Sequence, residues 1–80
     1  MKVKQTIEKE FPGLGERITA ARKASDLPLT QLAARAGMSY TNWYKIESGE
    51  AKSVPLETIR AMEEALGVDL GVDLGVRFEE

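Results

Sequence analysis

The sequence contains no cysteine and no histidine among its 80 residues. The first absence excludes a disulfide framework and a thiolate metal site. The second removes the side chain that most often serves as a general base or metal ligand near neutral pH. Adjacent glutamates occur at residues 63–64 and 79–80, but neighbours along a helix or strand point in different directions. We therefore expect no catalytic site, no metal site and no cofactor.

Long apolar runs are also lacking. No run approaches the roughly 20 residues that a membrane-spanning helix needs, and the N-terminal residues lack the apolar core of a signal peptide. We therefore expect a cytoplasmic protein with no membrane partner. Eighty residues make one small domain with little apolar area to bury, so a second subunit would add stability.

Basic residues do not outnumber acidic ones, and the net charge of −2 taken alone argues against DNA binding. The charges are unevenly spread, however. Residues 14–54 hold six basic and four acidic side chains, whereas residues 55–80 hold two basic and seven acidic ones. The middle of the chain is therefore mildly basic. An ordinary solvated surface explains this equally well, and a DNA-binding chain of this kind would neutralise few phosphates.

Residues 29–49 carry the pattern around which the rest is organised. Apolar residues recur at helical spacing in residues 29–36 and again in residues 40–48. Between them, Gly37 suits the left-handed position that ends a helix, and Ser39 suits the N-cap of the next one. Trp43 and Ile46 share an inward face, which leaves polar side chains facing outward. This arrangement predicts a helix-turn-helix whose second helix presents polar groups to a DNA major groove.

Two further helices are expected beside this pair. Residues 14–24 and residues 55–66 repeat apolar side chains at helical spacing, and Gly67 ends the second stretch. Residues 1–13 form an N-terminal arm that fits either a short helix capped by Thr6 or a short strand. Phe11 in this arm is expected to cover the core. The predicted fold is all-α, with four short helices in residues 14–66.

Residues 67–80 change character, because glycine at every fourth position opposes a helix. The tetrapeptide Gly-Val-Asp-Leu occurs twice and is followed by Gly-Val-Arg-Phe. Such strict alternation of apolar and other residues is typical of a strand. A strand confined to residues 76–78, with the repeat as a turn, is the alternative. We expect the longer strand to pair with a second chain through its apolar side chains, which are Val68, Leu70, Val72, Leu74, Val76 and Phe78.

Residues 14–66 resemble the Cro/repressor-type helix-turn-helix domain of the XRE family, which has a lambda-repressor-like fold. The resemblance covers about two thirds of the chain and combines helix caps, core positions and turns. The matching runs are Leu14-Gly-Glu-Arg-Ile18, Ala21-Arg-Lys-Ala24, Leu32-Ala-Ala-Arg-Ala-Gly-Met-Ser39, Trp43-Tyr-Lys-Ile-Glu-Ser-Gly49, Pro55-Leu-Glu-Thr58 and Ala65-Leu-Gly-Val68.

The resemblance implies roles for individual residues. An ion pair would join Arg22 in the first helix to Glu47 at the end of the recognition helix, and would aim Arg22 at a phosphate. Tyr40, Thr41 and Lys45 would reach base edges, and Tyr44 fits a contact with DNA or packing on the domain. The full set of expected phosphate contacts is Arg22, Thr30, Gln31, Ser39, Asn42, Tyr44, Lys52 and Ser53.

Two departures from the family pattern weaken the expected DNA contacts. Leu29, preceded by Pro28, stands where many members have a Gln after a capping Thr or Ser, and Thr30 and Gln31 are the available substitutes. Glu50 stands where the family has a basic residue, and it would repel phosphate. The expected C-terminal strand stands in place of the fifth helix common in the family.

The leading hypothesis is a sequence-specific transcription regulator that binds double-stranded DNA as a homodimer, with residues 39–47 as the recognition helix. The second hypothesis is an antitoxin-like or other protein-binding module on the same fold. Its tail, residues 67–80, would then add a strand to a partner protein. An enzyme is the third hypothesis, and it lacks the residues to build a site.

Overall fold

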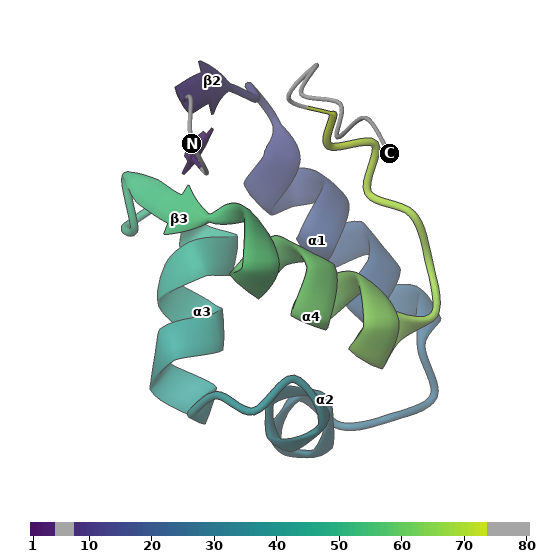
Figure 1. Cartoon of the computed structure of the whole chain (residues 1–80). Coiled ribbons are helices and arrows are strands. Elements are labelled where there is room, and N and C mark those ends of the chain that lie inside the picture. Colours follow the sequence, from purple (N-terminus) through teal and green to yellow (C-terminus); the bar gives the residue numbers. More distant parts are fainter. Residues whose placement is uncertain (5–7, 74–80) are drawn as a thin grey trace, which may run out of the picture.

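The computed structural model describes residues 1–4 and 8–73. In chain order they form β1 (Lys2–Lys4), β2 (Glu8–Glu10), α1 (Leu14–Ala24), α2 (Leu29–Arg35), α3 (Tyr40–Ser48), β3 (Ser53–Pro55) and α4 (Leu56–Leu66) (Figure 1). α3 packs against both α1 and α2, and α2 packs against α4. The four predicted helices are confirmed.

The turn between α2 and α3 is built from local hydrogen bonds. Gly37 has a φ of 73°, in the left-handed region that favours glycine. The amide of Met38 donates to the carbonyl oxygen of Ala33 at 2.9 Å and closes the end of α2. The hydroxyl of Ser39 accepts from the amide of Asn42 at 3.1 Å and caps α3. The predicted helix-turn-helix is therefore present, with its caps where the sequence placed them.

A small sheet makes the expected all-α fold wrong in one respect. Its strand order is β2-β1-β3, with β1 antiparallel to β2 and parallel to β3. Val3 lies opposite Val54, and both are buried, so the inner face of the sheet joins the core. For the described part of the N-terminal arm the strand alternative is right and the helix alternative is wrong. Thr6 lies outside the described residues.

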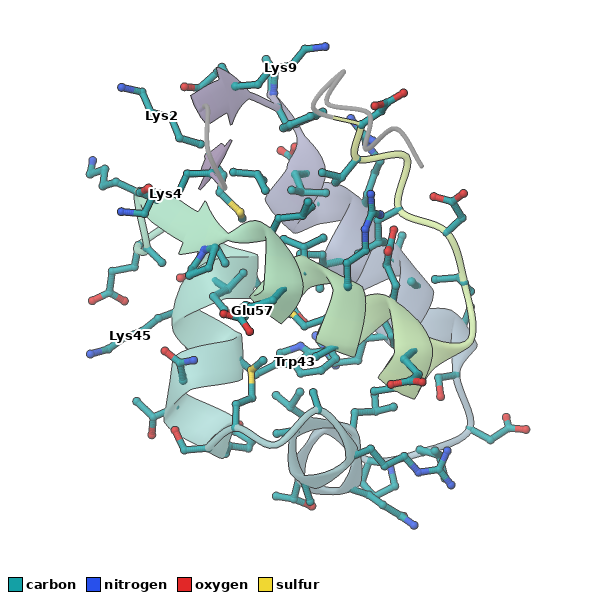
Figure 2. The ribbon with its side chains drawn as sticks, in the orientation of Figure 1. Lys2, Lys4, Lys9, Trp43, Lys45 and Glu57 are labelled. Atoms are coloured by element: carbon teal, nitrogen blue, oxygen red, sulfur yellow. The ribbon has the colours of Figure 1, made fainter. Side chains whose placement is uncertain are left out.

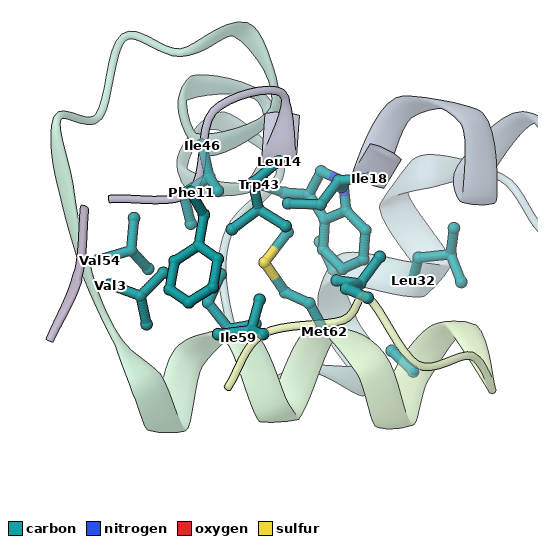
Figure 3. Close-up of a cluster of buried hydrophobic side chains, with 14 residues drawn as sticks. Val3, Phe11, Leu14, Ile18, Leu32, Trp43, Ile46, Val54, Ile59 and Met62 are labelled. Carbon is teal, nitrogen blue, oxygen red and sulfur yellow. The ribbon is translucent and has the colours of Figure 1, made fainter. Parts of the chain in front are cut away.

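The core takes side chains from all four helices, from β1 and β3, and from the loops. Trp43 is fully buried, and Figure 3 shows its ring among Leu14, Ile18 and Met62. Ile46 is buried beside it on α3, as the sequence predicted. Phe11 is 8% exposed and covers the end of the core near the sheet, which confirms its expected position. A large indole at the centre ties the position of α3 to the packing of the other helices.

The expected C-terminal strand does not appear in residues 68–73, which follow α4 without pairing to any described strand. Leu70 and Val72 are buried in the core of their own chain, whereas Val68 is 42% exposed. Gly71 has a φ of 76°, which breaks the strict alternation. The other residues assigned to the dimer strand, Leu74, Val76 and Phe78, lie outside the described residues.

Side chains replace a strand partner for this C-terminal segment, residues 68–73. Arg17 Nη1 donates to the carbonyl oxygen of Leu70 at 2.7 Å, and the Leu70 amide donates to Glu63 Oε2 at 2.7 Å. Arg60 Nη2 donates to the carbonyl oxygen of Val72 at 2.8 Å. Because α1 and α4 satisfy these backbone groups, the segment lies against its own domain without a sheet.

Candidate nucleic-acid interface

α3 presents one face to solvent because its opposite face is buried. Trp43, Ile46 and Glu47 are buried, whereas Thr41 and Lys45 are exposed one helical turn apart. Figure 2 shows Lys45 extending away from the domain while Trp43 points into it. The helix therefore presents the hydroxyl and methyl groups of Thr41 and the ammonium group of Lys45 on one face. The buried opposite face fixes the orientation of these groups.

Ser48, which is not among the residues expected from the sequence, extends this outer face by another turn. It is exposed and lies seven residues after Thr41, a spacing that returns to the same helix face. Its hydroxyl donates to the carbonyl oxygen of Lys45 at 3.3 Å and accepts from the amide of Glu50 at 3.4 Å. The helical period that runs through Thr41 and Lys45 is the signal that identifies it.

An ion pair joins the buried side of α3 to α1. Arg22 Nε lies 2.7 Å from Glu47 Oε2, and Arg22 Nη2 lies 2.8 Å from Glu47 Oε1, so the contact is bidentate. Trp43 Nε1 donates to the same Glu47 Oε2 at 3.0 Å. The structure thus brings together the two residues that the family resemblance pairs. The participation of Trp43 had no signal in the sequence.

The protonation of Glu47 follows from these contacts. Burial by itself would raise the pKa of Glu47, since it disfavours the charged form. Hydrogen bonds from Arg22 and Trp43, together with the charge of Arg22, outweigh burial and hold the pKa of Glu47 below its ordinary value. The same hydrogen bond raises the pKa of Arg22. Both groups are therefore charged at neutral pH, and the joint between α1 and α3 is ionic.

A close backbone approach completes this joint. A Cβ atom added at Gly15 of α1 would lie 2.5 Å from the carbonyl oxygen of Glu47 in α3. That separation is well inside van der Waals contact, so the two helices reach this distance only because residue 15 has no side chain. The orientation of α3 thus depends on a missing side chain as well as on an ion pair.

Tyr40 and Tyr44 lie one turn apart on α3, and their side chains are largely open to solvent. Tyr40 is 52% exposed and Tyr44 is 53% exposed. About half of the Tyr44 side chain is therefore accessible to a partner, and the rest is covered by the domain. The two phenol groups add hydrogen-bonding capacity beside the outer face that Thr41 and Lys45 form.

The remaining candidate phosphate contacts lie at three places around α3. One pair is at the start of α3, one in the first turn of α2 and one at the start of β3, and all six residues are exposed. They are, in that order, Ser39 with Asn42, Thr30 with Gln31, and Lys52 with Ser53. All six side chains are therefore accessible to a partner, in segments that precede, begin or follow α3.

Other kinds of site are not found in the part of the chain that the structure describes. Residues 1–4 and 8–73 contain no group of three or more acidic side chains able to hold a metal ion. No helix among them is long and apolar enough to span a membrane.

The fold and this outer face define a helix-turn-helix domain. A protein-family model described as a helix-turn-helix domain matches residues 13–74. That range contains α1 to α4 and every residue placed above at the candidate interface. The chain therefore belongs to the helix-turn-helix domain family, which agrees with its resemblance to XRE-type DNA-binding domains. No curated protein and no solved structure matches the chain with significance.

Proposed function

We propose that this chain is a sequence-specific DNA-binding transcription regulator of the XRE type, with α3 as its recognition helix. The observation that carries the proposal is the outer face of α3. Thr41 and Lys45 project from a helix whose inner face is fixed by Trp43 and by the Arg22–Glu47 ion pair. A rigid helix with short polar groups on its outer face suits entry into a major groove.

The side chains of α3 suggest how bases would be read. The methyl group of Thr41 fits contact with a thymine methyl, and the ammonium group of Lys45 fits donation to guanine N7 or O6. Tyr40 supplies a phenol at the N-terminal end of the helix, and its exposure supports a role there. Ser48 lies in line with Thr41 and Lys45 at the other end.

Phosphate contacts would fix the position of α3 in the groove. Arg22 meets Glu47 with its Nε and Nη2 atoms, and its side chain remains 26% exposed, which leaves donor capacity toward DNA. The other donors lie around the recognition helix, in the places described above. The full set comprises Arg22, Thr30, Gln31, Ser39, Asn42, Tyr44, Lys52 and Ser53.

A homodimer would suit this function, because one small domain carries one recognition helix. Two copies related by a two-fold axis would read two half-sites about one helical turn apart, roughly 34 Å. Binding at two half-sites would also offset the small number of basic residues in each chain. A regulator of this kind acts where the chromosome is, so we propose a cytoplasmic location.

Selection of bound duplexes from a random oligonucleotide pool tests the proposal. We expect enrichment of a palindromic sequence by the natural protein, and a changed preference at one position in each half-site for Lys45→Ala. Lys23→Ala, an exposed substitution on α1, serves as the control and should select the natural sequence. No enrichment at low salt would contradict the proposal.

An antitoxin-like or other protein-binding role is the second candidate. The acidic Glu50, directly after the glycine that ends α3, favours it because it opposes phosphate binding. The burial of Leu70 and Val72 argues against a free tail over residues 68–73. A failed selection at low salt would bring this candidate forward.

A further inference from the structure

A hollow of about 580 Å³ lies beside the recognition helix, outside the helix-turn-helix itself. β1 and β2 line one side, and the connection from α3 to β3 lines the other. Three of its lining residues are lysines, namely Lys2, Lys4 and Lys52. Gly49, at the end of α3, also lines it. The hollow therefore places basic side chains of the N-terminal arm next to the candidate interface.

The sheet fixes where these lysines stand. Val3 is fully buried, so the alternation of a strand turns the neighbouring Lys2 and Lys4 to the outer face, where both are exposed. β1 runs parallel to β3, and the Lys2 amide donates to the carbonyl oxygen of Lys52 at 2.9 Å. Backbone pairing thus fixes the spacing of the three lysines.

Lys2 lies opposite Glu10 and Lys4 opposite Glu8 in the pairing of β1 with β2. Within the described residues, none of the three lysines of the hollow forms an ion pair. Glu10 is the one carboxylate among the lining residues, and its Oε2 lies 2.8 Å from the amino group of Met1. That contact, followed by the charges of Met1 and Lys2, lowers the pKa of Glu10. Three lysine ammonium groups thus line the hollow beside one carboxylate, which already pairs with the amino group of Met1.

The hollow faces the same side as the recognition helix. Figure 2 shows Lys2, Lys4 and Lys45 projecting from the same side of the molecule, whereas Lys9 stands at another side. The ammonium group of Lys9 is 5.7 Å from the ring centroid of Phe11 and 3.4 Å from the carbonyl oxygen of Asp73. The hairpin therefore supplies two lysines toward the α3 side and one elsewhere.

We propose that Lys2, Lys4 and Lys52 hold a stretch of DNA backbone that flanks the base pairs read by α3. The N-terminal strand thereby becomes part of the DNA-binding surface. This inference rests on the proposed function, because α3 must first bind a duplex. Lysine ammonium groups bind phosphates as point charges and read no sequence, so these contacts add affinity at every site.

The test measures how the binding constant for the selected duplex depends on salt. Each phosphate contact contributes about 0.9 to the slope of log K against log salt concentration. Lys2→Ala/Lys4→Ala should therefore lower that slope by about 1.8 and leave the selected sequence unchanged. Lys9→Ala, which removes one positive charge from the same hairpin, should retain the natural slope. Thermal melting of both variants checks that the fold is kept.

A second measurement needs no substitution. Shortening the duplex until it ends at the base pairs that α3 reads removes the flanking phosphates. The slope of log K against log salt concentration should then be smaller for the natural protein than on the long duplex. On the short duplex it should equal the slope measured for Lys2→Ala/Lys4→Ala.

Two results would overturn the inference while the proposed function stands. One is an unchanged slope for folded Lys2→Ala/Lys4→Ala on the long duplex. The other is a loss of about 0.9 in slope for Lys9→Ala, the same loss per lysine removed, which would reflect net charge alone. Failure of the natural protein to bind any duplex would instead overturn the proposed function, and this inference with it.

Discussion

Glu47 is the one buried charged residue among those that the structure describes, at 8% exposure. Its carboxylate accepts from Arg22 on α1 and from Trp43 on its own helix. A buried charge is tolerated when it is paired and fully hydrogen-bonded, and both conditions hold here. Residue 47 therefore links Trp43 in the core to Arg22 on α1 and fixes the orientation of α3.

Glu47→Gln tests this role. The amide keeps one acceptor oxygen and replaces the other with an NH2 donor, so one of the three N–H groups that Glu47 accepts from loses its partner. We therefore expect the free energy of unfolding to fall by about 2 kcal/mol. Urea unfolding followed by circular dichroism measures it. Glu64→Gln, at an exposed position on α4, is the control and should stay within about 0.5 kcal/mol of the natural protein. Equal stability of the two variants would show that the ion pair contributes nothing.

The pKa of Glu47 also predicts how stability depends on pH. Because the folded state holds this pKa below its ordinary value, the contribution is complete above the unfolded-state pKa and is lost as the pH falls through the folded-state pKa. The free energy of unfolding should therefore fall as the pH drops below the ordinary glutamate pKa, about 4.3. It should fall less steeply in Glu47→Gln than in Glu64→Gln. Parallel curves for these two variants would contradict the assignment.

Single residues differ in how well the sequence reveals them. Trp43 and Ile46 were predictable as core because helical spacing is local information. The pairing of Arg22 with Glu47 needed the family resemblance, since nothing in the intervening 24 residues brings the two together. The bond from Trp43 to Glu47 was not predictable, because indole orientation is set by the packed core.

At the scale of elements, the contact between α1 and α3 depends on Gly15. Helix propensity alone predicts that Gly15→Ala stabilises the protein by about 1 kcal/mol. The structure predicts the opposite sign, because the new Cβ would lie 2.5 Å from the Glu47 carbonyl oxygen and would push the helices apart. We expect a loss of about 1–3 kcal/mol by chemical denaturation. Ala20→Ser, which adds one atom at an exposed site of α1, should change little. A stabilised Gly15→Ala would contradict the close approach.

The C-terminal segment gives a second element-scale prediction. A strand with one apolar face would bury Val68 and Leu70 on the same face. In the structure Leu70 is buried and Val68 is exposed. Leu70→Ala should lower the free energy of unfolding by about 2–4 kcal/mol, and Val68→Ala by less than about 0.5 kcal/mol. Thermal and urea unfolding of both variants would separate the two arrangements. Similar losses for both would favour the strand.

Elements were predictable where their signals are local. The four helices and the turn at Gly37 and Ser39 follow from spacing and caps within a few residues. β1 is stabilised by a parallel partner some 50 residues further along, which no local pattern reveals. Residues 68–73 carry strand-like alternation, but hydrogen bonds from Arg17 and Arg60 and to Glu63 determine their course.

At the scale of the whole molecule, charge is divided between two regions. The mildly basic residues 14–54 contain α2 and α3, whereas the acidic excess lies in residues 55–80. With a net charge of −2, weak general attraction to DNA is expected, so affinity depends on a small number of well-placed contacts. The rigid mounting of α3 on α1 therefore matters as much as the side chains on its outer face.

The most direct test of this account is an amide NMR titration of the labelled protein with its selected duplex. We expect the largest chemical-shift changes at residues 39–48 and 52–53, and little change at residues 61–66 of α4. Large changes confined to α4 and residues 68–73, with α3 unaffected, would contradict the account.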